Sequence, residues 1–401
     1  MENMVNTKHD TVSYESTGYK REIFNVEVLY NAFQKAKQNS DWKPEVQKFE
    51  INLLSELVKL YYEIKNRTYK FMPTNDFILS ERGKTRYISG DHIRDRVVKR
   101  ALCDEVLIPA VRKYLIYDNG ASLEGKGITF TRNRVEVHLR KFYMETGNNA
   151  GGILLGDYSK FFDNIQHQRL MDMFRSIIND ETSLWLLNKV FEQASVDVSY
   201  MSDVTFADRM NTIFNSLDHY NADKTLLTGE KFLDKRMNIG DQVAQVAGIF
   251  YPHRLDNYIK IVEGVKFYGR YMDDYYVIHK DMDYLVDLQA RIKEKALENG
   301  LFINEKKTRI CKVSDYWRFL KIQYSLTDTG RIIKKINPEN ITRMRRKLKK
   351  LVNILSKNDF INYYKAWFRN NYKNMSKEQR ENMDMLFYNL LEVHYVQHKI
   401  K

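Results

Sequence analysis

Hydrophobic residues recur at helical spacing over much of the chain. Residues 25–68 place Leu, Val, Phe and Tyr at intervals of three and four, most clearly in EINLLSELVKLYYEIKN at 50–66, and this spacing predicts amphipathic helices. The same periodicity predicts helices over 91–115 and about 283–299. Residues 240–260 predict a loop that enters a helix, perturbed near Pro252 because proline interrupts helical hydrogen bonding.

Three segments carry the short apolar runs that are typical of β-strands. FILSERGKTRYIS at 77–89 predicts a hairpin with Arg82-Gly83 as its turn. GILLGDYSKFF at 152–162 begins with an apolar strand, and KFYGRYMDDYYVIHK at 266–280 predicts another. After residue 330 the chain becomes basic and helical. This alternation of strands and helices predicts an α+β body with a helical C-terminal appendage.

Composition narrows the class of protein without fixing it. Of 401 residues, 43% are hydrophobic and 29% charged, as expected of a folded globular chain. The net charge of +13 is typical of a chain that binds a polyanion, with nucleic acid the leading candidate, and composition alone leaves a generally cationic surface as an equal alternative. Cys103 and Cys311 are the only cysteines, which argues against a disulfide framework. With no apolar run of membrane-spanning length and no signal-like N-terminus, we expect no membrane association and a cytoplasmic location.

Two adjacent aspartates interrupt the strand pattern at 266–280. Strand interiors disfavour aspartate and like charges repel, so we predict that Asp273 and Asp274 form the turn of a hairpin. An isolated Asp-Asp pair is more often an ordinary surface turn. Asp157 also ends an apolar strand, however, and one sheet could bring all three carboxylates together. Such a cluster would repel itself unless it bound cations, and hard oxygen ligands suit Mg²⁺.

The chain resembles reverse transcriptases in the order and spacing of its motifs over residues 75–325. YMDD at 271–274 is similar to the hallmark box of that family. GDQVAQ at 240–245 resembles the box G-x-x-x-S-Q but departs from it at Ala244. Further similar boxes are GKTR at 83–86, IRDRVV at 93–98, DYSKFFDNI at 157–165, INEKKT at 303–308 and FLK at 319–321.

The resemblance implies a right-hand polymerase fold with fingers, a palm built on an antiparallel sheet, and a helical thumb. We place the N-terminal helical extension and fingers at 1–150, the palm at 151–330 and the basic thumb at 331–401. Five prolines and no Gly/Ser-rich stretch argue against a flexible linker between independent domains. Residues 166–236 are predicted to be mostly helical, with a less ordered polar stretch near 195–230. The stretch at about 195–236 is long for its place between two boxes, and we interpret it as an insertion that contacts RNA or another subunit.

The resemblance also implies roles for the residues of the boxes. Asp157, Asp273 and Asp274, with the backbone of Tyr158, would hold two Mg²⁺ ions, with Mn²⁺ as an alternative. Phe162 would be the steric gate that leaves no room for a 2′-hydroxyl and so favours DNA synthesis. The simpler interpretation, packing in the core, suits Phe161 better than Phe162.

Basic residues would bind the nucleotide and the nucleic acid. In the nucleotide site, Lys84 and Arg86 would grip the triphosphate, although cations on a hairpin arm are commonly only solvated. Lys307 would touch the phosphates or form a surface salt bridge. Arg94 and Arg96 would hold template or pair internally with Asp91 and Asp95. The remaining candidates are Gly240 and Gln245 beside the nucleotide, Lys321 at the primer, and Arg343, Arg346, Lys347 and Lys350 on duplex phosphates.

The function implied is an RNA-directed DNA polymerase that extends a 3′-hydroxyl with dNTPs on an RNA template to give a DNA product. We favour a role in bacterial antiphage defence on a dedicated, structured non-coding RNA, because Ala244-Gln245 departs from the Ser-Gln of diversity-generating retroelements. The alternatives are the reverse transcriptase of such a retroelement, template-independent or protein-primed synthesis, and an inactive nucleic-acid-binding scaffold. Oligomerisation stays open.

Overall fold

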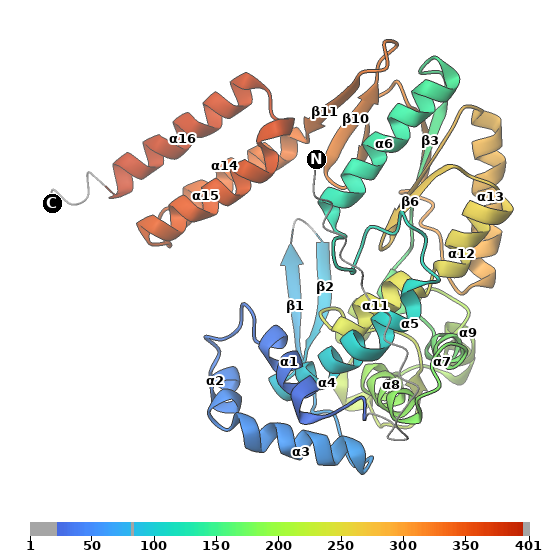
Figure 1. The fold of residues 1–401 in the computed structure, drawn as a ribbon, viewed down its shortest axis with the longest axis vertical. Coiled ribbons are helices and arrows are strands. Elements are labelled where there is room, and N and C mark those ends of the chain that lie inside the picture. The colour runs from blue at the N-terminus through green and yellow to red at the C-terminus, as the bar shows by residue number, and fades with distance from the viewer. Residues whose placement is uncertain (1–21, 82–83, 396–401) are drawn as a thin grey trace, which may run out of the picture.

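The computed structural model describes residues 22–81 and 84–395, and Figure 1 shows their arrangement. A four-stranded antiparallel sheet with strand order β6-β7-β3-β8 lies at the centre of the fold. The predicted strands within 152–162 and 266–280 are confirmed. The strands of this sheet are β3 (Gly152–Asp157), β6 (Phe267–Tyr271), β7 (Asp274–His279) and β8 (Arg309–Lys312).

Strand β3 divides its side chains between two cores. Ile153 and Leu155 pack with side chains of helix α6 (Ile128–Thr146), whereas Leu154 packs with side chains of α13 (Met282–Glu298). This period of two is what a strand buried on both faces produces. The sheet is therefore held between two helices, and the end of β3 at Asp157 is fixed in place.

The N-terminal helices are α1 (Val26–Ala36), α2 (Pro44–Ile51) and α3 (Leu53–Lys65). Helices α1 and α2 pack on α4 (Ile93–Leu102), and α3 packs on α1 and α2. Helix α4 continues through a π-helical turn into α5 (Ile108–Arg112). The helices predicted over 25–68 and 91–115 are thus confirmed. The predicted hairpin is also present: β1 (Asn75–Glu81) pairs with β2 (Lys84–Gly90) up to Glu81 opposite Lys84. Its predicted turn, Arg82-Gly83, lies outside the described residues.

The 195–236 segment is a folded unit rather than the less ordered polar stretch that the sequence indicated. It follows α7 (His167–Arg175) and α8 (Glu181–Ala194). Strands β4 (Val196–Asp197) and β5 (Phe232–Leu233) pair at its base. Its own apolar cluster includes Val198 and Phe214. Its remaining elements are α9 (Asp203–Arg209), α10 (Ser216–Tyr220) and the 3₁₀ turn Lys224–Leu226.

The helix predicted within 240–260 is broken at Pro252, as expected, into α11 (Gln242–Phe250) and α12 (His253–Asn257), with a π-helical turn at Tyr258–Val262. A second sheet, order β11-β10-β9, joins β9 (Trp317–Phe319), β10 (Ile322–Leu326) and β11 (Ile332–Ile336). Strand β11 lies within the stretch assigned to the thumb, yet it pairs with β10.

The C-terminal helices α14 (Pro338–Leu351), α15 (Lys357–Asn371) and α16 (Lys377–Tyr395) form a separate apolar cluster and extend to one side of the sheet (Figure 1). The sheets are antiparallel, and most N-terminal and C-terminal helices form parts of the fold that are separate from them. This arrangement confirms the α+β prediction. Within the described residues, no helix combines the length and apolar character needed to cross a membrane.

Candidate active site

Three aspartates lie near one another at the ends of β3 and β7, the two inner strands of the central sheet. Asp157 ends β3 and lies directly opposite Asp274 of the antiparallel strand β7. Tyr271 pairs with Asp274 in turn, so the two-residue connection is Met272-Asp273. The prediction that both aspartates form the turn is therefore wrong for Asp274, which is already part of the strand. Met272, with a φ of 53°, takes the left-handed conformation that closes such a tight turn.

A buried arginine holds this turn in place. Arg270 is fully buried, and its guanidinium donates to the carbonyl of Met272 at 2.9 Å and to that of Ile249 at 2.8 Å. Its charge is matched by Asp256, 2.7 Å from Nη2. Arg270 thus joins the β6–β7 turn to α11 and α12. Sequence reasoning missed this residue, although a charged side chain inside an apolar strand was the available signal.

The electrostatics of the carboxylates favour a cation. Burial, followed by the charge of Asp157, raises the pKa of Asp273 above its ordinary value. Burial and the charges of Asp273 and Asp157 raise the pKa of Asp274 to about 7. An oxygen-only donor set with excess negative charge fits a hard divalent ion. Among the described residues, no three His, Cys, Asp or Glu side chains lie close enough together to coordinate a metal ion by themselves.

Asp157 is held by two donors from the segment that follows α13. Lys307 Nζ lies 2.6 Å from Asp157 Oδ2, and Asn304 Nδ2 donates to the same oxygen at 2.9 Å. Lys307 is half-exposed and forms an ion pair with the buried Asp157, so the salt bridge that was one of its two predicted roles is present. The sequence did not indicate Asp157 as the partner. Phosphate contact stays a prediction. Asn304 was missed, and its place inside the INEKKT box was the signal.

A cavity of about 560 Å³ opens beside Asp273, and its lining contains site residues predicted from both the β1–β2 hairpin and the central sheet region. Lys84 and Arg86 of β2 line it from one side, and Asp273 and Lys307 from the other. Cations and carboxylates thus face one space, which suits a ligand carrying both phosphates and bound metal. Tyr158 and Phe162 are also among the lining residues.

Phe161 and Phe162 both line the cavity, but Phe161 is buried in the core whereas Phe162 is only partly buried. The ring of Phe162 lies against α11 at Gly248: a Cβ on that glycine would come within 3.1 Å of the ring and 3.2 Å of Met272 Sδ. Both contacts are too short for a side chain to fit without movement. Glycine at 248 therefore fixes how closely this ring approaches the helix. The gate role of Phe162 stays a prediction.

The loop before α11 lies against the β1–β2 hairpin. Gly240 has a φ of 109°, which favours glycine, and a Cβ there would lie 3.8 Å from the carbonyl oxygen of Ser89. Asp241 caps α11 by accepting from the N–H of Val243 at 2.7 Å. Gln245 accepts a hydrogen bond from Ser122 Oγ at 3.1 Å. The nucleotide contacts predicted for Gly240 and Gln245 stay predictions.

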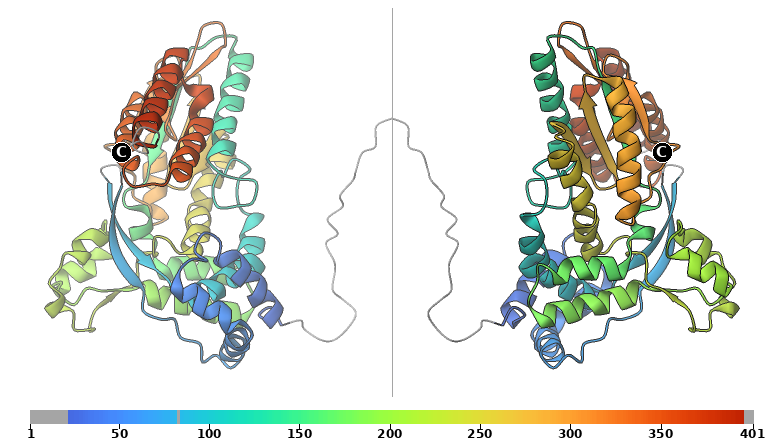
Figure 2. Two further views of the ribbon diagram at one scale, coloured as in Figure 1. Left: turned by 90° about the vertical axis from the view of Figure 1, so that its left-hand side faces the viewer. Right: turned by 90° about the vertical axis from the view of Figure 1, so that its right-hand side faces the viewer.

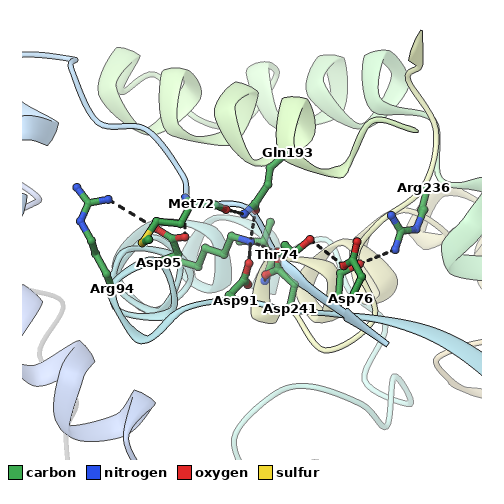
Figure 3. Close-up of polar contacts among 12 residues, drawn as sticks. Met72, Thr74, Asp76, Asp91, Arg94, Asp95, Gln193, Arg236 and Asp241 are labelled. Carbon is green, nitrogen blue, oxygen red and sulfur yellow. Dashed lines mark hydrogen bonds and ion pairs between the residues drawn. The ribbon is translucent and has the colours of Figure 1, made fainter. Parts of the chain in front are cut away.

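A buried ionic network connects Asp241 to the fingers. Lys99, which is almost fully buried, donates to Asp241 Oδ2 at 2.6 Å, to Gln193 Oε1 at 2.8 Å and to both oxygens of Asp91 at 2.9 Å. Figure 3 shows Asp91, Gln193 and Asp241 converging from three separate parts of the chain. Helix α4, the residue after β2, α8 and the start of α11 therefore share one set of polar contacts.

Arg94 and Arg96 do not lie in the cavity lined by Lys84 and Arg86 but in the N-terminal helical part. Arg94 pairs with Glu63 and donates to the carbonyl of Lys70 at 3.1 Å. Arg96 donates to Ser40 Oγ at 3.1 Å and to the carbonyl of Ala36. These contacts favour the internal interpretation over template binding.

Of the two partners named for the arginines, one is confirmed and one is wrong. Asp95 forms an ion pair with Arg94 at 3.8 Å and also accepts from the backbone of Met72, whereas Asp91 pairs with Lys99 instead. The reason is that helix α4 turns its two arginines toward α1 and α3, whose contact with α4 cannot be read from the local sequence.

A second cavity, about 590 Å³, brings several of the nucleic-acid candidates together. Lys321 lines it from the β9–β10 turn, where Leu320 and Lys321 both have positive φ. Arg132 donates to the carbonyl of Leu320 at 2.5 and 3.1 Å and so supports that turn. Arg343 and Lys347 of α14 line the same cavity, and Arg346 and Lys350 are exposed on that helix.

Comparison with protein families gives one match that extends over most of the site. The family model described as reverse transcriptase (RNA-dependent DNA polymerase) matches residues 64–324, more than half of the 401-residue chain. The match covers β1–β2, all four strands of the central sheet and the β9–β10 turn. No curated protein matches the chain.

Proposed function

The chain belongs to the reverse transcriptase family, and from this membership we propose that Asp157, Asp273 and Asp274 form its catalytic centre. It is an RNA-directed DNA polymerase of right-hand fold, a nucleotidyltransferase that works with an RNA template, dNTPs and divalent metal ions. The observation that carries the proposal is the position of Asp157 opposite Asp274 at the ends of β3 and β7, next to Asp273, which lines one cavity together with Lys84 and Arg86 of β2.

The three carboxylates and the backbone of Tyr158 would hold two Mg²⁺ ions, or Mn²⁺ as an alternative. When bound there, the ions supply charge that activates the primer 3′-hydroxyl and neutralises the leaving pyrophosphate. Lys84 and Arg86 would orient the triphosphate, with Gly240, Gln245 and Lys307 as further contacts. The phosphates of template and primer would be held by five basic residues, namely Lys321, Arg343, Arg346, Lys347 and Lys350. The fingers with the N-terminal extension would span residues 1–150, the palm 151–330 and the thumb 331–401.

Single-nucleotide primer extension on an RNA template tests this function and its sugar selectivity. We expect the wild-type chain to incorporate dNTPs in the presence of Mg²⁺ and to use rNTPs poorly. Phe162→Val should raise the relative kcat/KM for rNTPs by at least about tenfold, because the smaller side chain leaves room for the 2′-hydroxyl. Phe161→Val, which shortens the more deeply buried neighbouring ring of the same cavity lining, is the matched comparison and should leave the selectivity largely unchanged. Unchanged selectivity in Phe162→Val with active enzyme would remove the gate role.

The ion pair between Lys307 and Asp157 predicts a mixed effect of removing the lysine. In Lys307→Met, the Mg²⁺ concentration for half-maximal rate should fall about two- to fivefold, since the ammonium no longer competes for the carboxylate. The maximal rate should fall about tenfold because a phosphate contact is lost. Magnesium titrations of primer extension measure both quantities, with the exposed neighbour in Lys306→Met as the control. A change in neither would contradict both roles.

For the biological role, we propose antiphage defence in the bacterial cytoplasm on a dedicated, structured non-coding RNA. The departure at Ala244 from the Ser-Gln of diversity-generating retroelements supports this role over theirs. Phage plating on cells that carry the gene with its flanking sequence should be reduced by the wild-type chain and restored by Asp273→Asn. If neither the wild-type chain nor Asp273→Asn reduces plating, or if adenine-specific changes occur in a repeat near the gene, the retroelement role would be favoured.

A further inference from the structure

The 195–236 segment lies beside the nucleotide cavity rather than apart from it. Figure 2 shows its yellow-green helices next to the blue β1–β2 hairpin. Ile213, Ser216 and Leu217 from this segment line the same cavity as Lys84 and Arg86. The cavity therefore has a third wall, in addition to the fingers hairpin and the edge of the central sheet.

The segment is bonded to the turn that carries Phe162. Asn164 Nδ2 donates to the carbonyl of Phe214 at 3.1 Å, and its Oδ1 accepts from the N–H of the same residue at 2.8 Å. Asp163 Oδ2 accepts from the N–H of Ser216 at 3.1 Å. Asn164 and Asp163 are both buried, so losing these bonds would leave polar groups without partners.

The segment also contacts the fingers hairpin. The ring of Tyr220 packs against that of Tyr87 in β2, with centroids 5.2 Å apart. Arg236, at the C-terminal end of the segment, lies over the same Tyr87 ring and donates to Ser89 Oγ at 2.8 Å. One folded unit thus touches both the hairpin that carries Lys84 and the turn that carries Phe162.

A buried lysine braces the segment from its base. Lys235 is fully buried and donates to the carbonyls of Thr212 at 2.7 Å and of Arg209 and Met210 at 3.2 Å. These carbonyls lie at the C-terminal end of α9 and just after it, where helical partners are lacking, and the Met210 carbonyl also accepts from Gln166 Nε2 at 3.1 Å. The stretch from Arg209 to Phe214 is consequently fixed in front of the cavity.

We propose that the 195–236 segment is a specificity wall of the nucleotide site. Ile213 and Leu217 contact the incoming deoxynucleoside triphosphate, and the bonds from Phe214 and Ser216 to Asn164 and Asp163 set the position of Phe162. The inference rests on the proposed polymerase function. It replaces the earlier interpretation of this stretch as a contact for RNA or another subunit, because its cavity-lining side chains face the nucleotide site.

Two pairs of matched variants test the wall. The double variant Ile213→Ala/Leu217→Ala should raise the KM for dNTP about three- to tenfold with kcat within about twofold. Leu226→Ala, a half-exposed leucine of the same segment outside the cavity lining, should match the wild type. Asp163→Ala should reduce discrimination against rNTPs about tenfold, whereas Asp163→Asn, which keeps an acceptor for the Ser216 N–H, should largely retain it.

Binding of dNTP to the full-length chain with Ca²⁺, binding of the RNA template, and thermal unfolding are measured for each variant. A rise in KM and in the dNTP dissociation constant with unchanged RNA affinity supports the wall. Unchanged dNTP constants with weakened RNA affinity overturn it in favour of an RNA contact. If the wild-type chain binds dNTP without incorporating it, the polymerase proposal fails and the binding constants of the variants still decide the inference. Absence of dNTP binding in the wild-type chain overturns the inference as well.

Discussion

Replacing Asp273 with asparagine is expected to lower the rate of dNTP incorporation by about a thousandfold or more, because a carboxylate that binds the catalytic cations is lost. The substitution keeps the shape of the side chain. The turn itself depends on Met272 in its left-handed conformation and on the bond from Arg270 to the Met272 carbonyl, and both persist. Pre-steady-state incorporation of one dNTP on an RNA template measures the effect, and template affinity should not change.

Asp287→Asn is a matched control, since it removes one exposed carboxylate from α13 on the same protein. Its rate should equal that of the wild-type chain. Asp274→Asn should reproduce the loss seen with Asp273→Asn. Full incorporation by both variants would refute the assignment of the catalytic centre and leave the carboxylates a structural role, as expected of a scaffold that binds nucleic acid without polymerising.

The parts of the site that depend on local pattern could be predicted from the sequence. A strand buried on both faces is uniformly apolar, so β3 was visible as a run ending at Asp157, and the aspartates of YMDD were conspicuous within a second run. The hairpin with Lys84 and Arg86 followed from alternation around a turn signal. These elements account for three of the four strands of the central sheet, since β8 was not predicted, and for the part of the cavity lining that β2 and Asp273 supply.

The parts that depend on distant contacts could not be predicted. Lys99 is one polar residue among many in a helix with a polar pattern, and its partner Asp241 lies 142 positions away. Arg94 and Arg96 were ambiguous for the same reason, since only the packing of α1 and α3 on α4 decides their partners. The wall formed by the 195–236 segment looked less ordered because its small apolar cluster is spread over a long polar stretch.

The Lys99 network is expected to make one of the largest contributions of any side chain to stability. Burial alone would lower the pKa of Lys99, but the charges of Asp241 and Asp91 overcome it and raise that pKa. Conversely, burial and the charge of Asp241 raise the pKa of Asp91 to about 6 despite the nearby ammonium. Among the residues that the structure describes, Lys99 is the cation that pairs with both buried carboxylates, and neither carboxylate can be rehydrated without opening the fold.

Lys99→Met should therefore reduce the free energy of unfolding by about 3–5 kcal/mol, the cost of leaving buried charge unpaired. Lys35→Met breaks a comparable 2.8 Å ion pair with Asp104 at a half-exposed site, and its cost should stay below about 1 kcal/mol. Equilibrium urea unfolding of both variants gives the comparison. Adding Asp91→Asn and Asp241→Asn to Lys99→Met should recover much of the loss, because no uncompensated charge remains. A cost for Lys99→Met as small as that for Lys35→Met would mean that water reaches the network, and Asp241 would then be a poor anchor for the start of α11 beside the nucleotide cavity.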